Sequence, residues 1–249
     1  MDLKLSYSRA STYLQCPYKY YLSYVVKLPG LPKPYFSFGH SLHSALEWFY
    51  KPKLTVEVPT LDELLLVYTE SWESEGYGSP TEEARARDEG KSLLINYHRA
   101  VKKMWKPSFD VEKRFSVDIE GITVTGAIDR IDYDEDGDSL ELLDYKTGKW
   151  VPKSITDSDK FQLTIYAIAS KKMWNKPITN VSYLFLREMR YLSFLPTEAD
   201  EQNVTNQLRF VRDGIERKNF DRIENKFCPW CDYKDRCHTT KVITVEGGF

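Results

Sequence analysis

The sequence predicts an α/β fold in which helices cover one mixed β-sheet. Along the chain, the expected elements change from helices to hairpin-linked strands, and then to a helix, two further strands and a last long helix. The 249 residues suit one domain, and the 41% hydrophobic and 29% charged residues are typical of a chain with a packed core.

The N-terminal part is expected to be helical. The helices are predicted at Ser8–Tyr24, Phe38–Tyr50, Leu61–Trp72 and Thr81–Trp105. Ser8 or Ser11 is available as an N-cap for the first helix. In the second helix, Leu42, Ala45 and Phe49 fall on one face, as in a helix that packs on a core. A proline-rich break separates these two helices.

The hydrophobic pattern then changes to alternation. Strands are predicted at Phe109–Ile119, Ile122–Tyr133, Leu140–Tyr145, Val181–Arg187 and Tyr191–Leu195. They are rich in β-branched and aromatic residues. Gly121 marks the first turn, and the acidic residues 134–138 mark the second. Helices at Asp159–Met173 and Thr197–Lys218 complete the pattern before a cysteine-rich tail.

The charge balance excludes one class of protein. With 35 basic and 37 acidic residues the net charge is −2, so the chain as a whole is not a basic nucleic-acid coat. Residues 1–53 and 91–114 are locally basic and could contact a polyanion, although such runs are more often solvated helix faces. No apolar run reaches the roughly 18 residues of a spanning helix, and the first residues resemble no signal peptide. We therefore expect a soluble, cytoplasmic protein, in the host cytoplasm if the chain is viral.

Two acidic residues and a lysine form the first chemical pattern. Asp129 ends the segment Gly126–Asp129, and Asp144 and Lys146 flank Tyr145 on a later strand. If the two strands are neighbours, the carboxylates can meet near the end of the sheet, with Asp144 and Lys146 on one face. Paired carboxylates favour a hard cation such as Mg²⁺ or Mn²⁺, and a lysine beside them could orient a water that attacks a phosphodiester. A surface ion pair is the alternative interpretation.

These residues resemble the signature of the PD-(D/E)xK nucleases, in their RecB-like branch. In that branch one strand reads Gly-x-x-Asp, as here up to Asp129, and another reads Asp-Tyr-Lys-Thr-Gly, as here from Asp144. An upstream helix carries Gly-x-x-x-His, matched by residues 39–43, and a downstream helix carries Gln-x-x-x-Tyr, matched by residues 162–166. Four motifs in the same order, each on the expected type of element, are far more specific than any one alone.

The resemblance implies a restriction-endonuclease-like fold and a role for each matched residue. The ligands of Mg²⁺ or Mn²⁺ would be His43, Asp129, Asp144 and the backbone carbonyl of Tyr145. Lys146 would position the nucleophilic water. Gln162 and Tyr166 would face the site and steady the lysine, a metal-bound water or the DNA strand, although Tyr166 could simply be a core residue.

The four cysteines form the second chemical pattern. Cys228 and Cys231 have a chelating Cys-x-x-Cys spacing, Cys237 follows six residues later, and Cys16 lies far upstream. A structural zinc site and a four-thiolate [4Fe–4S] cluster both fit this spacing, and disulfides are a poor third choice in a cytosolic chain. The spacing alone does not separate zinc from iron.

The resemblance favours iron. AddB-type nucleases and CRISPR-associated exonucleases have one N-terminal cysteine and three near the C-terminus, which bind [4Fe–4S]. By this likeness the whole chain is a single nuclease domain, with residues 1–35 and 219–249 as an iron–sulfur region and residues 36–218 as the nuclease core. The cluster would join the N- and C-terminal segments and is expected to be structural.

The expected function is that of a metal-dependent DNA exonuclease. The resemblance implies single-stranded DNA as substrate, with 5′-to-3′ polarity, in DNA repair and recombination, viral DNA processing or CRISPR spacer acquisition. The expected partner is DNA, single-stranded or with a free end. Because the chain carries no helicase ATP-binding motif, it would act alone or lend its nuclease to a protein partner, such as a helicase or CRISPR adaptation proteins. The alternative is a non-catalytic DNA-binding or redox-sensing iron–sulfur module.

Overall fold

The computed structural model describes residues 3–51, 57–134 and 137–239. It divides into two compact units. The sheet unit is built from Met1–Tyr7 and Pro32–Leu208, and the cysteine unit from Ser8–Leu31 and Arg209–Phe249. The nuclease motifs therefore all lie in the sheet unit, and the four cysteines all lie in the cysteine unit.

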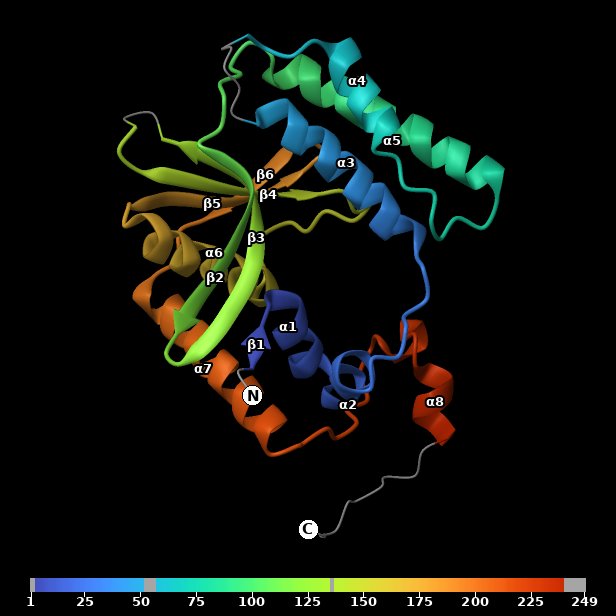
Figure 1. Ribbon diagram of the computed structural model, residues 1–249, viewed down its shortest axis with the longest axis vertical. Helices are drawn as coiled ribbons and strands as arrows, with labels where there is room; N and C mark the ends of the chain where they lie inside the picture. Colours follow the sequence, from blue (N-terminus) through green and yellow to red (C-terminus); the bar gives the residue numbers. More distant parts are fainter. Residues whose placement is uncertain (1–2, 52–56, 135–136, 240–249) are drawn as a thin grey trace. The chain divides into compact units, whose positions relative to one another are not determined.

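Within the described residues, the sheet unit contains a six-stranded mixed sheet (Figure 1). Its strands are β1 (Lys4–Leu5), β2 (Asp110–Ile119), β3 (Ile122–Tyr133), β4 (Leu140–Lys146), β5 (Ile178–Phe185) and β6 (Arg190–Phe194). The order is β1-β3-β4-β5-β6, with β2 paired to β3. The β1–β3 and β4–β5 pairs are parallel and the other pairs are antiparallel, so the predicted mixed sheet is confirmed.

Helices of the sheet unit flank this sheet, as predicted. They are α3 (Pro34–Tyr50), α4 (Leu61–Glu70), α5 (Pro80–Val101), α6 (Asp157–Trp174) and the first part of α7 (Glu198–Glu216). The cysteine unit contains most of α1 (Tyr7–Gln15), α2 (Pro17–Tyr20), the end of α7 and α8 (Lys234–Thr239). A π-helical turn, η1 (Tyr21–Val25), follows α2, and a 3₁₀ turn, η2 (Cys228–Trp230), precedes α8. In the part of the chain that the structure describes, no helix is both long and apolar enough to cross a membrane.

The observed elements differ from the predicted ones at a few places. The single helix expected over residues 8–24 is three short segments, because Pro17 has no N–H to continue α1 and starts α2 instead. Helix α3 begins at Pro34 rather than Phe38, since proline is well suited to the first turn. Strand β1 was not expected, because two residues carry no readable alternation. The acidic turn expected at residues 134–138 includes residues 135 and 136, which lie outside the described residues.

One edge of β3 is shared by two strands in succession. At its start, Thr123 and Val124 pair with β1, and from Arg130 onward the same strand pairs with β4. The opposite edge pairs with β2 along most of its length. The stretch that contains Asp129 therefore lies between the two pairings, after the last residue paired with β1 and before the first residue paired with β4. We call it the changeover stretch.

Gly126 lies in this changeover stretch for a packing reason. It pairs across the hairpin with Phe115, and a Cβ atom at Gly126 would lie 2.5 Å from the Phe115 ring. The ring also contacts Tyr166 of α6 edge-on, with centroids 6.2 Å apart. The glycine of the Gly-x-x-Asp motif thus makes room for an aromatic side chain that packs between β3 and α6.

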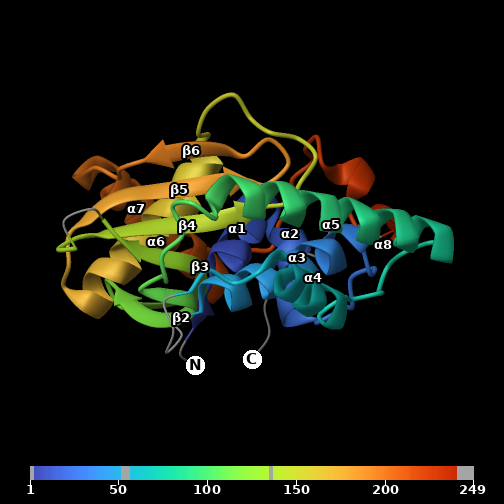
Figure 2. The same cartoon turned by 90° about the horizontal axis from the view of Figure 1, so that it is seen from above.

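The alternation of β4 separates two environments. Asp144 and Lys146 face α6, where they contact Gln162. Tyr145 faces the opposite side, within a buried hydrophobic cluster that includes Leu42, Leu64 and other side chains of α3, α4 and α5. These three helices lie side by side (Figures 1 and 2). The polar site is therefore anchored by a core directly behind it.

Candidate active site

Asp129 is held at the point where β3 and β4 diverge. Its Oδ2 atom accepts a 2.7 Å hydrogen bond from the backbone N–H of Tyr145, and the residue is only 9% exposed. Asp129 precedes the first residue of β3 that pairs with β4, so this side-chain bond takes the place of a backbone bond between the two strands. It fixes the Asp129 carboxylate beside the Asp144–Lys146 segment.

His43 approaches the same point from α3. Its Nε2 atom lies 3.1 Å from the carbonyl oxygen of Tyr145, and its Nδ1 atom lies 3.4 Å from Oδ2 of Asp129. Gly39, one turn earlier, lets Thr147 approach closely, because a Cβ at this position would lie 3.3 Å from Oγ1 of Thr147. The helical motif thus brings the imidazole against the end of β4.

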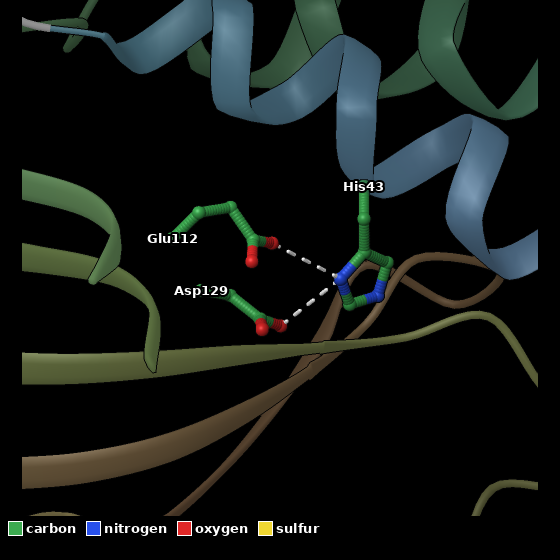
Figure 3. A group of neighbouring side chains, drawn as sticks. All are labelled: His43, Glu112 and Asp129. Carbon is green, nitrogen blue, oxygen red and sulfur yellow. Dashed lines mark ion pairs between the residues drawn. The ribbon is translucent and has the colours of Figure 1, made fainter. Parts of the chain in front are cut away.

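A third acidic residue, Glu112, belongs to this group although the motifs do not include it. Its Oε1 atom lies 3.7 Å from Nδ1 of His43. The possible ligand atoms of His43, Glu112 and Asp129 all lie within 4.8 Å of one another, and Figure 3 shows both carboxylates directed at the imidazole.

The sequence contains a signal for Glu112 that motif reasoning missed. In the β2–β3 hairpin, Val111 pairs with Arg130 and Lys113 with Ile128, so Glu112 stands opposite Asp129. Counting back across the Gly121 turn would have found it. Its backbone has φ of 45°, a left-handed conformation that is uncommon outside glycine and that often marks a functional position.

Asp144 and Lys146 form the centre of a second, adjoining cluster. The Lys146 Nζ atom lies 2.6 Å from Oδ2 of Asp144 and donates a 3.2 Å hydrogen bond to Oε1 of Gln162. Oδ1 of Asp144 accepts hydrogen bonds from Gln162 Nε2 at 3.0 Å and from the Tyr166 hydroxyl at 3.2 Å. The Tyr183 hydroxyl donates to Gln162, and the Tyr183 ring lies 4.1 Å from the lysine nitrogen.

The two clusters interact electrostatically. Burial and repulsion from Asp144 raise the pKa of the Asp129 carboxyl. Burial alone would lower the pKa of His43, but Asp129, Glu112 and Asp144 together raise this pKa to about 9. Burial would also lower the pKa of Lys146, yet the adjacent Asp144 carboxylate raises it above its usual value. Both cationic groups are therefore charged at neutral pH and offset the crowded carboxylates.

The donor set suits a hard divalent cation. Carboxylate oxygens, a backbone carbonyl oxygen and one imidazole nitrogen are ligands that Mg²⁺ and Mn²⁺ accept, and no thiolate lies among them. The close group of ligand atoms comprises His43, Glu112 and Asp129 and does not include Asp144, whose oxygens contact Lys146, Gln162 and Tyr166. The arrangement can hold a cation next to a fixed ammonium group.

The four cysteines lie together in the cysteine unit. They line one cavity of about 280 Å³, and all four are free thiols. The Sγ atom of Cys228 accepts a 3.3 Å hydrogen bond from the N–H of Asn225. Burial raises the pKa of Cys237, and the nearby thiols of Cys16 and Cys231 add to this shift. The chemistry of this donor set suits a thiophilic metal centre.

Comparison with known proteins places this site in context. The gene 69 protein of Mycobacterium phage D29 is 28% identical over 138 residues, which are 53% of this chain and 48% of the phage protein. The gene 69 protein of Mycobacterium phage L5 is 21% identical over 287 aligned positions, which cover 95% of this chain and 96% of the phage protein. The aligned region thus spans about half of one phage protein and nearly all of the other.

A solved structure supports the same fold. A protein from Eubacterium rectale, described as a candidate exonuclease, matches with a TM-score of 0.58 at 12% sequence identity, over 99% of this chain and 90% of that one. The family model of the PD-(D/E)XK nuclease superfamily matches residues 4–238 and so includes both the acidic site and the cysteine cavity. The chain is therefore a member of the PD-(D/E)XK nuclease superfamily.

Proposed function

We propose that this protein is a Mg²⁺- or Mn²⁺-dependent DNA exonuclease that hydrolyses phosphodiester bonds. One observation carries the proposal: His43, Asp129 and the Tyr145 carbonyl converge next to the Asp144–Lys146 pair. Membership of a nuclease superfamily supports the reaction class, and the Eubacterium rectale neighbour supports an exonuclease.

The proposed cation ligands are His43, Asp129, Asp144 and the carbonyl of Tyr145, with Glu112 beside them. When bound, a divalent ion in such a site lowers the pKa of an attacking water and stabilises charge on the phosphate. The excess of carboxylates supports this assignment, because their mutual repulsion favours a cation.

Lys146 acts as a fixed positive charge. Its raised pKa keeps the amine protonated, so it can donate hydrogen bonds but cannot serve as a general base near neutral pH. The ammonium group would orient the attacking water and offset the negative charge that develops on the phosphoryl oxygens. Gln162 and Tyr183 hold it in place, through a hydrogen bond and a ring contact.

Gln162 and Tyr166 serve as positioning residues. They lie one helical turn apart on α6, and both donate hydrogen bonds to Oδ1 of Asp144. They thereby fix the orientation of the carboxylate whose other oxygen contacts Lys146.

In the cysteine unit we propose a [4Fe–4S] cluster held by Cys16, Cys228, Cys231 and Cys237. Four free thiols around one cavity support a four-thiolate centre, and the resemblance to iron–sulfur nucleases supports iron over structural zinc. The cluster would cross-link the segment after α1 to the tail. Absorption near 400 nm in anaerobically purified protein, lost in Cys237→Ser, is the expected result, and stoichiometric zinc in a colourless protein would overturn the assignment.

Single-stranded DNA is the proposed substrate, with 5′-to-3′ polarity. The resemblance to RecB-like exonucleases supports both, and the likeness to gene 69 proteins of two mycobacteriophages supports a viral setting among the roles expected. Repair, recombination and spacer acquisition with a helicase or adaptation proteins remain roles that the resemblance implies.

A nuclease assay tests the proposal. End-labelled single-stranded and duplex DNA would be incubated with purified protein and Mg²⁺ or Mn²⁺, with and without a chelator. We expect cleavage that stops with the chelator and that falls at least 100-fold in Asp144→Asn and in Lys146→Ala, with the circular dichroism spectrum unchanged. Full activity in either variant, or in excess chelator, would overturn the proposed mechanism.

A further inference from the structure

Two aromatic side chains are exposed at the start of α3. Tyr35 and Phe36 are 58% and 57% exposed, and their ring centroids lie 4.6 Å apart with an interplanar angle of 51°. Single exposed apolar side chains are common on proteins, whereas adjoining large ones more often mark a binding surface. The role proposed for α3, which is to supply His43, does not require them.

The position of this pair on the helix relates it to the active site. Phe36 precedes His43 by seven residues, so the two lie on one stripe of α3, two turns and about 10 Å apart. Tyr35 lies one turn before Gly39, where the absent side chain lets Thr147 approach. The chain that leaves Lys146 therefore passes α3 between the aromatic pair and His43.

A third exposed aromatic residue follows on that same segment. Trp150 is 74% exposed and lies three residues after Thr147, a distance that the backbone spans in at most about 11 Å. The segment 147–155 contains Lys149 and Lys153 and no acidic residue. Trp150 is therefore confined to the neighbourhood of the same end of the sheet.

The charges around these rings include a lysine in contact with the pair. The Lys33 Nζ atom lies 5.9 Å from the centre of the Tyr35 ring. Two acidic residues lie along the same part of α3: Glu73 is paired with His40 at 3.2 Å, and the exposed Glu75 accepts a hydrogen bond from Ser37 through its backbone carbonyl. Aromatic rings interleaved with lysines are the usual surface for unpaired nucleic acid, because bases stack on the rings while the ammonium groups face the phosphates.

We propose that Tyr35, Phe36 and Trp150 form a stacking surface for unpaired bases next to the phosphate that is cleaved. This inference rests on the proposed nuclease function and deepens it, since it assigns the preference for single-stranded DNA to named side chains. Duplex DNA keeps its bases paired in the helix interior and cannot offer their faces to these rings. The surface therefore selects a single-stranded end.

The test uses the full chain and a base whose fluorescence reports stacking. Single-stranded oligonucleotides with 2-aminopurine at successive positions from the 5′ end would be bound in Ca²⁺, to prevent cleavage. We expect quenching at one or two adjacent positions with the unaltered protein. In Tyr35→Ala/Phe36→Ala and in Trp150→Ala the quenching should be lost and single-strand binding weakened about 10-fold, with duplex binding unchanged.

Matched variants separate stacking from a general loss of surface. Leu66 on α4 is 58% exposed, so Leu66→Ala removes a comparable apolar side chain and should change neither quenching nor affinity. Phe36→Trp keeps a flat ring and should retain the quenching. Thermal melting of each variant shows whether it is folded.

The outcomes distinguish the two proposals. Unchanged quenching and single-strand affinity in folded Tyr35→Ala/Phe36→Ala and Trp150→Ala proteins would overturn the stacking surface, and would leave a protein partner as its occupant. Failure of the unaltered protein to cleave DNA with Mg²⁺ or Mn²⁺ would instead overturn the nuclease function. Because quenching is read in Ca²⁺ without turnover, it tests the surface separately from the reaction.

Discussion

Glu112 combines a left-handed backbone conformation with a contact to His43 in the candidate cation site. A left-handed backbone at a residue other than glycine or asparagine costs of the order of 1–3 kcal/mol. Here the conformation is fixed by the β2–β3 hairpin and turns the carboxylate toward His43. Other residues of the described chain, such as Glu120 and Met189, also have positive φ, so it is the contact with His43 that relates Glu112 to the site.

Two substitutions of Glu112 distinguish the effect of its backbone conformation from the effect of its carboxylate. Glu112→Gly suits the positive φ angle and removes the acid, so we expect a free energy of unfolding within about 1 kcal/mol of the original and Mn²⁺ affinity reduced several-fold. Glu112→Gln keeps the strain and should also bind Mn²⁺ less tightly. Calorimetric titration with Mn²⁺ and urea unfolding provide the two measurements. Unchanged Mn²⁺ affinity in both variants would exclude Glu112 from the cation site.

The raised pKa of His43 predicts a pH dependence. Because a metal binds the neutral imidazole, Mn²⁺ must displace the proton that the surrounding carboxylates hold up to about pH 9. Mn²⁺ affinity should therefore rise between pH 6 and pH 9, with about one proton released from His43 per ion near neutral pH and a further fraction from Asp129, whose pKa is raised to about 7. In the metal-free protein, the stability that protonated His43 contributes is fully present below about pH 6.5 and is lost as the pH rises through about 9.

Calorimetry in buffers of different ionisation enthalpy measures the released protons. His43→Asn is the control, because it offers a neutral ligand that does not titrate. Equal proton release from the original protein and from His43→Asn would contradict the prediction.

At the scale of elements, polar caps set where the site-bearing helices begin. Thr156 and Asp159 form a reciprocal capping box at the start of α6, and Thr60 and Glu63 form the same arrangement on α4. Helix α6 carries the side chains that hold Asp144, whereas α4 packs behind the sheet and contributes to the core. The two caps are chemically alike and differ in what their helices hold.

This pair of caps allows a matched comparison. Thr156→Ala and Thr60→Ala should each lower the free energy of unfolding by about 1 kcal/mol. Only Thr156→Ala should also reduce the rate of cleavage, because it loosens the helix that positions Gln162 and Tyr166. Urea unfolding and initial rates on labelled DNA check the two effects. An equal loss of rate in both variants would show that stability alone, and not the position of α6, limits activity.

Most of the elements could be predicted because their patterns are local. The β2–β3 hairpin shows alternation on both sides of Gly121, and the predicted limits of β3 equal the observed ones. The motif residues could be located because each lies at a strand or helix position that the pattern marks. Glu112 could not be found from motifs, since its contribution depends on a cross-strand partner, and β1 was missed because two residues show no periodicity.

At the scale of the whole molecule, a buried arginine connects several elements of the sheet unit. Arg130 of β3 pairs with Asp132, and it donates hydrogen bonds to the hydroxyl groups of Tyr97 on α5 and Tyr145 on β4. Its guanidinium also lies 3.9 Å from the centre of the Tyr50 ring on α3. The Arg130 side chain therefore joins β3, next to Asp129, to Tyr145 of β4, next to Asp144 and Lys146, and to the tyrosines of α3 and α5.

Loss of this arginine should be costly. Arg130→Met leaves Asp132 buried without its partner, and we expect the free energy of unfolding to fall by about 3–5 kcal/mol. Arg130→Met/Asp132→Leu removes both charges and should recover part of this loss. Chemical denaturation of the two variants makes the comparison. If the double variant is no more stable than the single one, the loss comes from the contacts of the Arg130 guanidinium with the tyrosines, and not from the unpaired Asp132 carboxylate.

The shared edge of β3 has a mechanical consequence. Leu5 is fully buried and pairs with Val124, and only a few residues further along β3 the same edge begins its partnership with β4, beside Asp129. A pull on β1, whether from a fused tag or a bound protein, would act on the part of β3 that leads to the Asp129 carboxylate. Strand β1 is in this sense mechanically connected, through β3, to the active site.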